Sequence, residues 1–414
     1  MKQQVDRTGC TWKALSAMWS IILFGLLIPT SFAEVQQFEE AKLEAWPAQG
    51  ASGNFFGYSV ALQDDFALIG APYYTTFVEG HAYIFRQDPD SGEWLPDVEL
   101  YPSSGGPGDE FGRSVGLCGD VALIGANKPV TGYVYRYDSI KAVWNEEAML
   151  LPETGWGPTS SFCVALDADV AVIGAPSHYE NGIRTGAAFV YRYNPTSLVW
   201  EEETKLLASD GEDGDAFGLS LAISGDTVLV GAAYDDSIGS AYVFRYDADT
   251  GSWTEEAKLR STSSTLYNNF GRSVAVFDDV ALIGAPWYQN KGCAYVFRND
   301  STNRGWSEEA QLLDPQGEWL DNFGWSVDLD DNVALVGANY GEIGKGAAHL
   351  YRYIPGAHTW RKEARLLPSD TESLVQFGYS VDLQGGNLLV GEPGDSYGGK
   401  HEVLSILLAL SRIS

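Results

Sequence analysis

Cysteine is scarce in this chain, with four among 414 residues. Cys10 lies in an N-terminal segment discussed below, which leaves Cys118, Cys163 and Cys293, an odd number scattered along the sequence. An exported disulfide scaffold has many more cysteines, in even number. We therefore expect these three to be small apolar strand residues, and the fold to be stabilised by packing.

Basic residues are also few. The chain has 26 Lys and Arg against 56 Asp and Glu, a formal charge of −30, and it has no basic patch. Such a charge repels nucleic acid and anionic membranes, and it helps to keep an exported protein soluble. The composition therefore excludes a nucleic-acid partner.

Long apolar runs are absent except near the N-terminus. Lys2, Arg7 and Lys13 precede the run SAMWSIILFGLLIPTSFA, which ends in small residues. This pattern predicts a secretory signal peptide over residues 1–33, cleaved near Ala33, and a protein that is secreted, extracellular or on the cell surface. The alternative is an N-terminal membrane anchor, for which the run is near the lower length limit. No transmembrane segment is expected after cleavage, because the C-terminal VLSILLALS is too short.

Catalytic and metal-binding motifs are missing as well. The five histidines are dispersed, and none stands beside a Cys, Ser or carboxylate at the spacing of a nucleophilic or metal-ligand motif. The sequence predicts no catalytic residue, no metal site and no cofactor. Carboxylates are abundant enough to leave open a hydrolase that uses two acids brought together by the fold.

A repeat fills the rest of the chain. The stretch FGRSVAVFDDVALIGAP, from Phe270 to Pro286, reads as two β-branched, apolar strands joined by a two-residue turn at Asp278-Asp279. Six related stretches begin at Phe56, Phe111, Ser160, Phe217, Phe323 and Phe377. The third copy has Ser160-Ser161 in place of Phe-Gly, so we expect a weaker contact there. Seven copies at a near-constant spacing indicate a repeat architecture.

Each copy continues into two further strands. GSAYVFRY from Gly239 is a third strand, a turn rich in Asp and Gly follows, and WTEEAKL from Trp253 is a fourth. Four antiparallel strands form one sheet, and seven such sheets around an axis form a β-propeller. We therefore predict an all-β fold over residues 34–414, a seven-bladed β-propeller of four-stranded antiparallel blades.

The chain ends suggest how such a ring closes. The last copy lacks a fourth strand, whereas FEEAKL, from Phe38 to Leu43, matches the fourth-strand pattern with Phe38 in the Trp position. Pairing of this N-terminal strand with the last sheet would close the ring and remove exposed edges.

Other repeated positions have structural interpretations. The Phe of each copy is expected to pack between neighbouring sheets, and the Trp to belong to the core. A third-strand Arg recurs opposite fourth-strand Glu pairs, which predicts cross-strand ion pairs, with an anion-binding ring as the alternative. The turns with Asp88 and Asp90, and with Asp247 and Asp249, are expected to be Asx-type turns, with a weak ion site as the alternative.

These motifs resemble a known family. The FG…GAP signature followed by G-x-A-Y-V-F is similar to the FG-GAP repeat, known from the propeller head of integrin alpha subunits, and closer to short repeats of exported bacterial and algal proteins. The resemblance implies an extracellular recognition or cell-adhesion module. Integrin repeats often carry a calcium loop between the first two strands. Here that connection has two residues, too short to surround a cation, so the calcium sites are not carried over.

The loops are the best candidates for binding. In a propeller the fourth-to-first and second-to-third connections emerge on one face, and in this chain they hold most of the loop aromatics. We predict a monomer that binds a protein or glycan ligand through this face without catalysis. The alternatives are aromatics that only cap the blades, and a secreted propeller hydrolase or lyase acting on extracellular polysaccharide. The candidate ligand-binding residues are Tyr73, Tyr74, Trp287, Tyr288, Trp319 and Tyr340.

Overall fold

The computed structural model describes residues 35–38, 41–45, 55–72, 79–153, 163–262, 266–300, 305–368, 376–394 and 404–409. The chain divides into the units 1–33 and 34–414, and only the second contains described residues. The predicted signal peptide therefore lies outside the described part. Among the described residues, no helix combines the length and hydrophobicity that a membrane span requires.

The unit 34–414 is all-β, and its sheets are antiparallel blades of consecutive strands, as the sequence predicted. Three short helices, η1 (Asp235–Ser237), η2 (Tyr288–Asn290) and α1 (Gly341–Gly344), lie between second and third strands. In chain order, the blades contain β3 (Ser59–Gln63), β4 (Phe66–Ala71), β5 (His81–Gln87), β6 (Trp94–Leu100); β7 (Ser114–Cys118), β8 (Val121–Asn127), β9 (Val130–Asp138), β10 (Val143–Leu150); β11 (Cys163–Asp167), β12 (Val170–Ala175), β13 (Ala187–Asn194), β14 (Val199–Leu206); β15 (Ser220–Ser224), β16 (Thr227–Ala232), β17 (Ser240–Asp247), β18 (Ser252–Leu259); β19 (Ser273–Phe277), β20 (Val280–Ala285), β21 (Cys293–Asp300), β22 (Gly305–Leu312); β23 (Phe323–Asp330), β24 (Val333–Ala338), β25 (Ala347–Ile354), β26 (Thr359–Leu367); and β27 (Ser380–Gln384), β28 (Asn387–Glu392), β29 (Leu404–Ala409).

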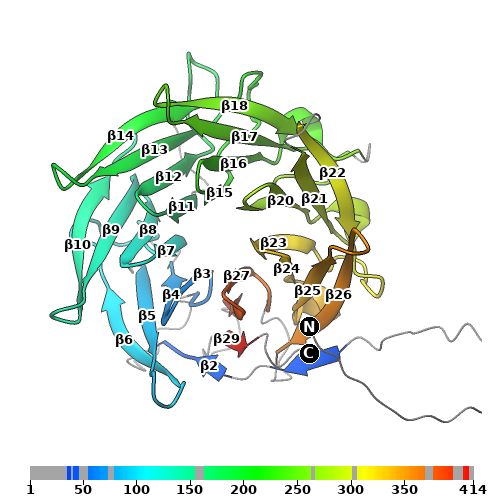
Figure 1. The fold of residues 1–414 in the computed structure, drawn as a ribbon, viewed down its shortest axis with the longest axis horizontal. Helices are drawn as coiled ribbons and strands as arrows, with labels where there is room; N and C mark the ends of the chain where they lie inside the picture. Colours follow the sequence, from blue (N-terminus) through cyan, green and yellow to red (C-terminus); the bar gives the residue numbers. More distant parts are fainter. Residues whose placement is uncertain are drawn as a thin grey trace, which may run out of the picture. The chain divides into compact units, whose positions relative to one another are not determined.

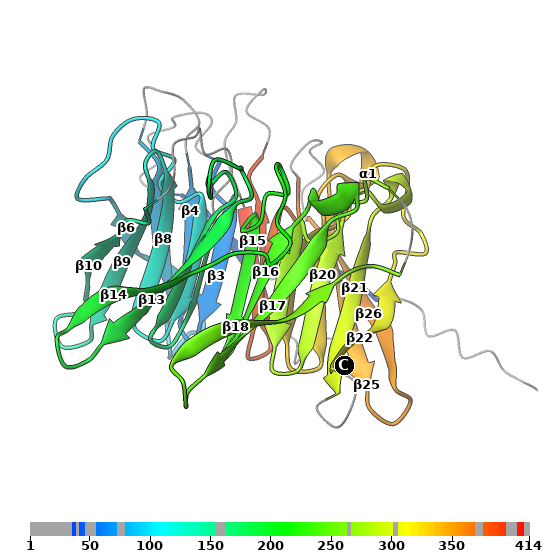
Figure 2. The same ribbon diagram turned by 90° about the horizontal axis from the view of Figure 1, so that it is seen from above.

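The blades are arranged radially, with the first strand of each nearest the axis and the fourth at the rim (Figure 1). Seen from the side, α1 lies at one end of the blades and the hairpin turns of β17–β18 and β25–β26 lie at the other (Figure 2). The end with α1 carries the fourth-to-first and second-to-third connections, and we call it the loop face.

The N-terminal strands change the expected number of four-stranded blades. Among the described residues, six sheets have four strands and one further sheet has five, so the prediction of seven four-stranded blades was wrong. The extra strand is β1 (Val35–Phe38), which pairs in parallel with β26, while β2 (Ala41–Leu43) pairs antiparallel with β29. The predicted single strand Phe38–Leu43 is thus divided between two blades. The outer edge of β26 explains the division, because its unpaired backbone groups can accept another strand.

The second strands form the most buried layer of each blade. All six residues of β16 and of β20 are buried, which suits their content of Val, Leu, Ile, Ala and Gly. The first and second strands are joined by two-residue turns, as predicted, and Asp278 takes a positive φ of 49° in one of them.

The Phe of each FG pair fills the space between blades. Phe111 is fully buried and belongs to one cluster with Leu68 and Ile84 of the preceding blade and Ile124 of its own. Its ring meets that of Tyr133 edge to face, with 5.4 Å between the centroids. The prediction that this Phe packs between neighbouring sheets is confirmed.

Two glycines and a serine explain the FG and GAP motifs. A Cβ on Gly231, the GAP glycine of one copy, would lie 2.1 Å from the carbonyl oxygen of Gly271, the FG glycine of the next. Ser220, opposite Gly231 in the same hairpin, donates its hydroxyl to that carbonyl at 2.8 Å. Gly271 has a φ of 87°, which favours glycine. The two motifs are therefore the two sides of one backbone contact between neighbouring blades.

Polar rim contacts follow the predicted pairs. The guanidinium of Arg192 lies 2.8 Å from Glu203, and that of Arg298 lies 2.9 Å from Glu309. Corresponding Arg–Glu pairs occur at Arg136, Arg245 and Arg352, whereas Arg86 pairs with Asp65. In the turn after β5, the carboxylate of Asp88 accepts hydrogen bonds from the amides of Asp90 and Ser91, so the Asx-type turn is also confirmed.

We expect Gly231→Ala to lower the free energy of unfolding by about 3 kcal/mol, because the new methyl group meets a backbone carbonyl that cannot turn away. Chemical denaturation measures the change. Gly356→Ala is the matched control, since a Cβ there meets nothing within 4 Å. Equal stability of the two variants would contradict the contact.

Candidate functional site

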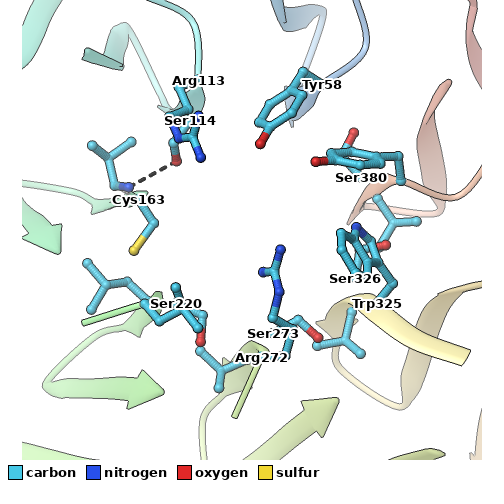
Figure 3. A pocket seen from close by; sticks show the side chains of 17 residues that line it. Tyr58, Arg113, Ser114, Cys163, Ser220, Arg272, Ser273, Trp325, Ser326 and Ser380 are labelled. Atoms are coloured by element: carbon cyan, nitrogen blue, oxygen red, sulfur yellow. Dashed lines mark hydrogen bonds between the residues drawn. The ribbon is translucent and has the colours of Figure 1, made fainter. Parts of the chain in front are cut away.

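A cavity of about 230 Å³ opens at the axis. It lies where the inner strands begin, directly after the FG motifs. Its side chains come from all the inner strands and converge on one space (Figure 3). We call the set Tyr58, Arg113, Arg272, Trp325 and Tyr379 the axial mouth. The remaining lining residues are Ser114, Cys163, Val164, Leu219, Ser220, Leu221, Ser273, Val274, Ser326, Val327, Ser380 and Val381.

The repeat places these residues at the axis. Each residue of the axial mouth directly follows an FG pair, and the next residue is a serine that begins the inner strand. The serine hydroxyl binds the FG carbonyl of the next copy, as Ser273 does to Gly324 at 2.9 Å. Since the Ser and Gly are fixed by this contact, the side chain between them projects toward the axis and is free to differ between copies.

The side chains of the axial mouth form a row of neighbouring aromatic rings with an arginine at each end. The guanidinium of Arg272 lies 4.5 Å from the ring centre of Trp325, and Trp325 and Tyr379 have centroids 5.6 Å apart. Tyr379 and Tyr58 follow at 4.8 Å, and the guanidinium of Arg113 lies 5.6 Å from the ring centre of Tyr58. A cation within about 6 Å of an aromatic face is attracted to it. Each end of the row therefore holds an arginine in a favourable position.

Burial raises the pKa of two other groups in the cavity. The pKa of the Tyr379 hydroxyl is raised because it is buried and lies beside Tyr58. Burial also raises the pKa of the Cys163 thiol to about 12, which leaves almost none of the reactive thiolate at neutral pH. Cys118, Cys163 and Cys293 are all free thiols.

A second cavity of about 240 Å³ lies further along the axis. The two cavities adjoin, because both are lined by Val164, Leu221, Val274, Val327 and Val381. The second cavity contains two carboxylates, of which Asp382 accepts a hydrogen bond from the Leu62 amide at 2.7 Å and Asp328 accepts one from the Leu383 amide at 2.6 Å.

Burial raises the pKa of both carboxyl groups. For Asp328 the pKa rises to about 7, with the charge of Asp330 adding to the effect of burial. For Asp382 the next cause after burial is the charge of Asp328. Each carboxylate also ties its inner strand to a neighbouring strand through an amide, which gives both a structural role.

Three of the aromatic residues predicted for binding lie on neighbouring loops of the loop face. The exposed fractions of Trp287, Trp319 and Tyr340 are 49%, 68% and 40%. The Leu320 amide donates to the Asn290 carbonyl at 2.6 Å, and the Tyr340 amide donates to the Asp321 carbonyl at 3.3 Å. These bonds join the three loops. We call Trp287, Trp319 and Tyr340 the aromatic group.

The other three residues predicted for binding do not belong to the aromatic group. Tyr288 is half-buried, and its ring packs against Tyr295 with centroids 6.3 Å apart. Tyr73 and Tyr74 lie outside the described residues. In the described ranges, no group of three or more His, Cys, Asp or Glu side chains is placed to hold a metal ion.

The sequence interpretation missed the axial mouth. Its members share one repeat position but differ in type, so they looked like variation within the motif. Comparison of that position across the seven copies would have found them, because it holds two arginines, four aromatics and one leucine.

We expect the pKa shift of Asp328 to make stability depend on pH. Because the folded-state pKa exceeds the ordinary value of 3.8, both states are protonated at low pH, and the unfolded state ionises first as the pH rises. The free energy of unfolding should therefore fall between about pH 4 and pH 7. Asp328→Asn keeps the acceptor oxygen and cannot ionise, so it should reduce this fall by about 1–2 kcal/mol.

Urea denaturation across that pH range measures the difference. Asp249→Asn, in an exposed turn, is the control and should run parallel to the unaltered protein. A parallel curve for Asp328→Asn would show that Asp328 ionises without cost in the folded state.

Two comparisons relate this chain to known proteins. The solved structure described as "Crystal structure of the Saccharomyces cerevisiae Sqt1" is similar over 91% of this chain and 100% of that chain, with 10% sequence identity and a TM-score of 0.49. The family model described as FG-GAP repeat matches residues 38–85, 94–135, 200–244, 253–297, 306–351 and 360–402. These segments cover more than half of the chain, and they omit the copy that contains Ser160-Ser161. The chain therefore belongs to the FG-GAP repeat family.

Proposed function

We propose that this protein is an exported, non-catalytic recognition or adhesion module that binds an extracellular protein or glycan through the loop face. The observation that carries the proposal is the aromatic group, in which exposed Trp and Tyr side chains stand on adjoining, hydrogen-bonded loops. Large exposed aromatics of this kind supply most of the binding energy at many interfaces.

The loop with Trp319 is held in shape by several contacts. The carboxylate of Asp321 accepts from the Glu318 amide, and the Gly317 amide donates to the Asp314 carbonyl at 3.0 Å. The Lys291 ammonium donates to the Gly317 carbonyl at 2.6 Å. A loop fixed before binding loses little conformational entropy when a ligand arrives, so this arrangement favours recognition.

The export part of the proposal rests on the N-terminal sequence pattern of residues 1–33. Family membership is consistent with a binding module, although a fold by itself does not determine a function. Monomeric behaviour is proposed because the acidic charge opposes self-association.

We also propose that the N-terminal segment closes the propeller. The first and last copies are in contact, because the Ser380 hydroxyl donates to the Gly57 carbonyl at 2.8 Å. Pairing of β2 with β29 adds backbone hydrogen bonds in the last blade, and pairing of β1 with β26 attaches the same segment to the blade before it.

Deletion of residues 34–44 tests this closure. We expect it to lower the free energy of unfolding by about 3 kcal/mol, because it removes two strands and leaves two sheet edges exposed. Thermal and urea denaturation measure the loss, and deletion of residues 410–414 is a control of similar kind at the other terminus. An unchanged melting temperature for the 34–44 deletion would contradict closure.

The binding function is tested by a screen of extracellular polysaccharides and surface proteins, followed by titration of any ligand retained. We expect Trp319→Ala or Trp287→Ala to weaken binding by about 2 kcal/mol, or some thirtyfold, with little effect on folding.

Ile140→Ala is the matched control, since Ile140 is an apolar residue with 95% exposure in a turn of the opposite face. Loss of binding in that variant, with both Trp variants unaffected, would place the ligand on the other face. Cleavage of a retained glycan would favour the hydrolase or lyase alternative.

A further inference from the structure

The axial mouth has a charge opposite to that of the chain. Two arginines and no Asp or Glu line this cavity, although acidic residues outnumber basic ones by 56 to 26 in the whole sequence. Positive charge that lines a recess of an otherwise acidic protein indicates a local site for an anion.

Arg272 is available for such a ligand. In the described part of the chain, its side chain makes no ion pair, and its recorded contact is the stacking on Trp325. The strand arginines are different, since Arg192 and Arg298 each pair with a Glu. Stacking covers the face of a guanidinium and leaves its N–H edge for an acceptor.

Arg113 brings a second positive charge to the opposite side of the mouth. It lies 2.7 Å from Glu110, but the ammonium of Lys128 lies 2.9 Å from the same carboxylate. One carboxylate thus faces two cations. Both guanidiniums also influence the Tyr379 hydroxyl and the Cys163 thiol, lowering the pKa of each against the larger effect of burial, which agrees with their convergence on one space.

The floor of the cavity limits how far an anion can enter. Apolar side chains such as Val274 and Val327 lie at the boundary between the mouth and the second cavity. The carboxyl groups of Asp328 and Asp382 lie beyond them and offer no positive charge that would attract an anion. An anion is therefore held at the level of the arginines.

The aromatic rings define the rest of the ligand. Tyr58, Trp325 and Tyr379 present ring surfaces beside the arginines, and the apolar C–H face of a sugar ring can pack on such surfaces. A volume of about 230 Å³ suits a single sugar unit rather than a longer segment. A carboxylate can accept parallel N–H bonds from a guanidinium.

We propose that the axial mouth binds a hexuronic acid unit, with its carboxylate between Arg272 and Arg113 and its ring against the aromatic side chains. The ligand is a free sugar acid or the end of an acidic polysaccharide, which share this chemistry. The site is separate from the aromatic group, and it can be occupied even if the loops bind nothing.

Titration of the full mature chain with D-glucuronate tests the proposal by calorimetry or ligand-observed NMR, with D-glucose and acetate as comparison ligands. A glucuronate-terminated oligosaccharide distinguishes a polysaccharide end from the free acid. We expect glucuronate to bind at millimolar concentration, and glucose and acetate to bind at least about tenfold more weakly.

Arg272→Gln should weaken glucuronate binding at least about tenfold, and Arg272→Lys should restore part of it. Arg245→Gln, at a rim arginine paired with Glu256, is the matched control and should bind as the unaltered protein does. Melting curves establish that each variant is folded. Unchanged glucuronate affinity in Arg272→Gln, or equal binding of glucose, would overturn the site, and equal binding of acetate would overturn its assignment to a sugar acid.

Discussion

Backbone contact between neighbouring copies is the constraint on which the rest of this structure depends. The GAP glycine of one copy faces the FG carbonyl of the next so closely that no Cβ fits between them, as at Gly231 and Gly271. Ser220 bonds to the same carbonyl, so this junction combines a steric and a polar requirement. The last and first copies meet in the same way, since a Cβ on Gly391 would lie 2.1 Å from the Gly57 carbonyl oxygen.

This contact also organises the candidate sites. Fixing the Gly and Ser of each copy directs the residue between them to the axis, where a varied set forms the axial mouth. The loops beyond the contact carry no such requirement, so they can present Trp287, Trp319 and Tyr340 to solvent. Rigid inner strands thus support two surfaces whose chemistry can change without disturbing the blades.

The periodic parts of the fold could be predicted from the sequence because each has a local physical cause. Alternating strands, two-residue turns such as Asp278-Asp279 and the buried Phe of FG all follow from residue type and spacing. The division of the N-terminal segment between β26 and β29 could not, because strand edges in several blades offer similar backbone groups.

The candidate sites were predictable only in part. Trp287, Trp319 and Tyr340 were found because exposed loop aromatics are visible in sequence, whereas the packing of Tyr288 on Tyr295 depends on tertiary contact. The pairing of Arg272 with Trp325 joins residues from adjacent copies, and it becomes apparent only when the inner strands are placed around one axis.

Segment-resolved hydrogen exchange tests most directly whether contacts between copies hold the whole propeller, including the junction of its first and last copies. We expect the amides of β3 and β27 to exchange as slowly as those of β15, because all three inner strands have neighbours on both sides. Fast exchange in β3 and β27, with β15 still protected, would contradict this view and show that the first and last copies are not held together in solution.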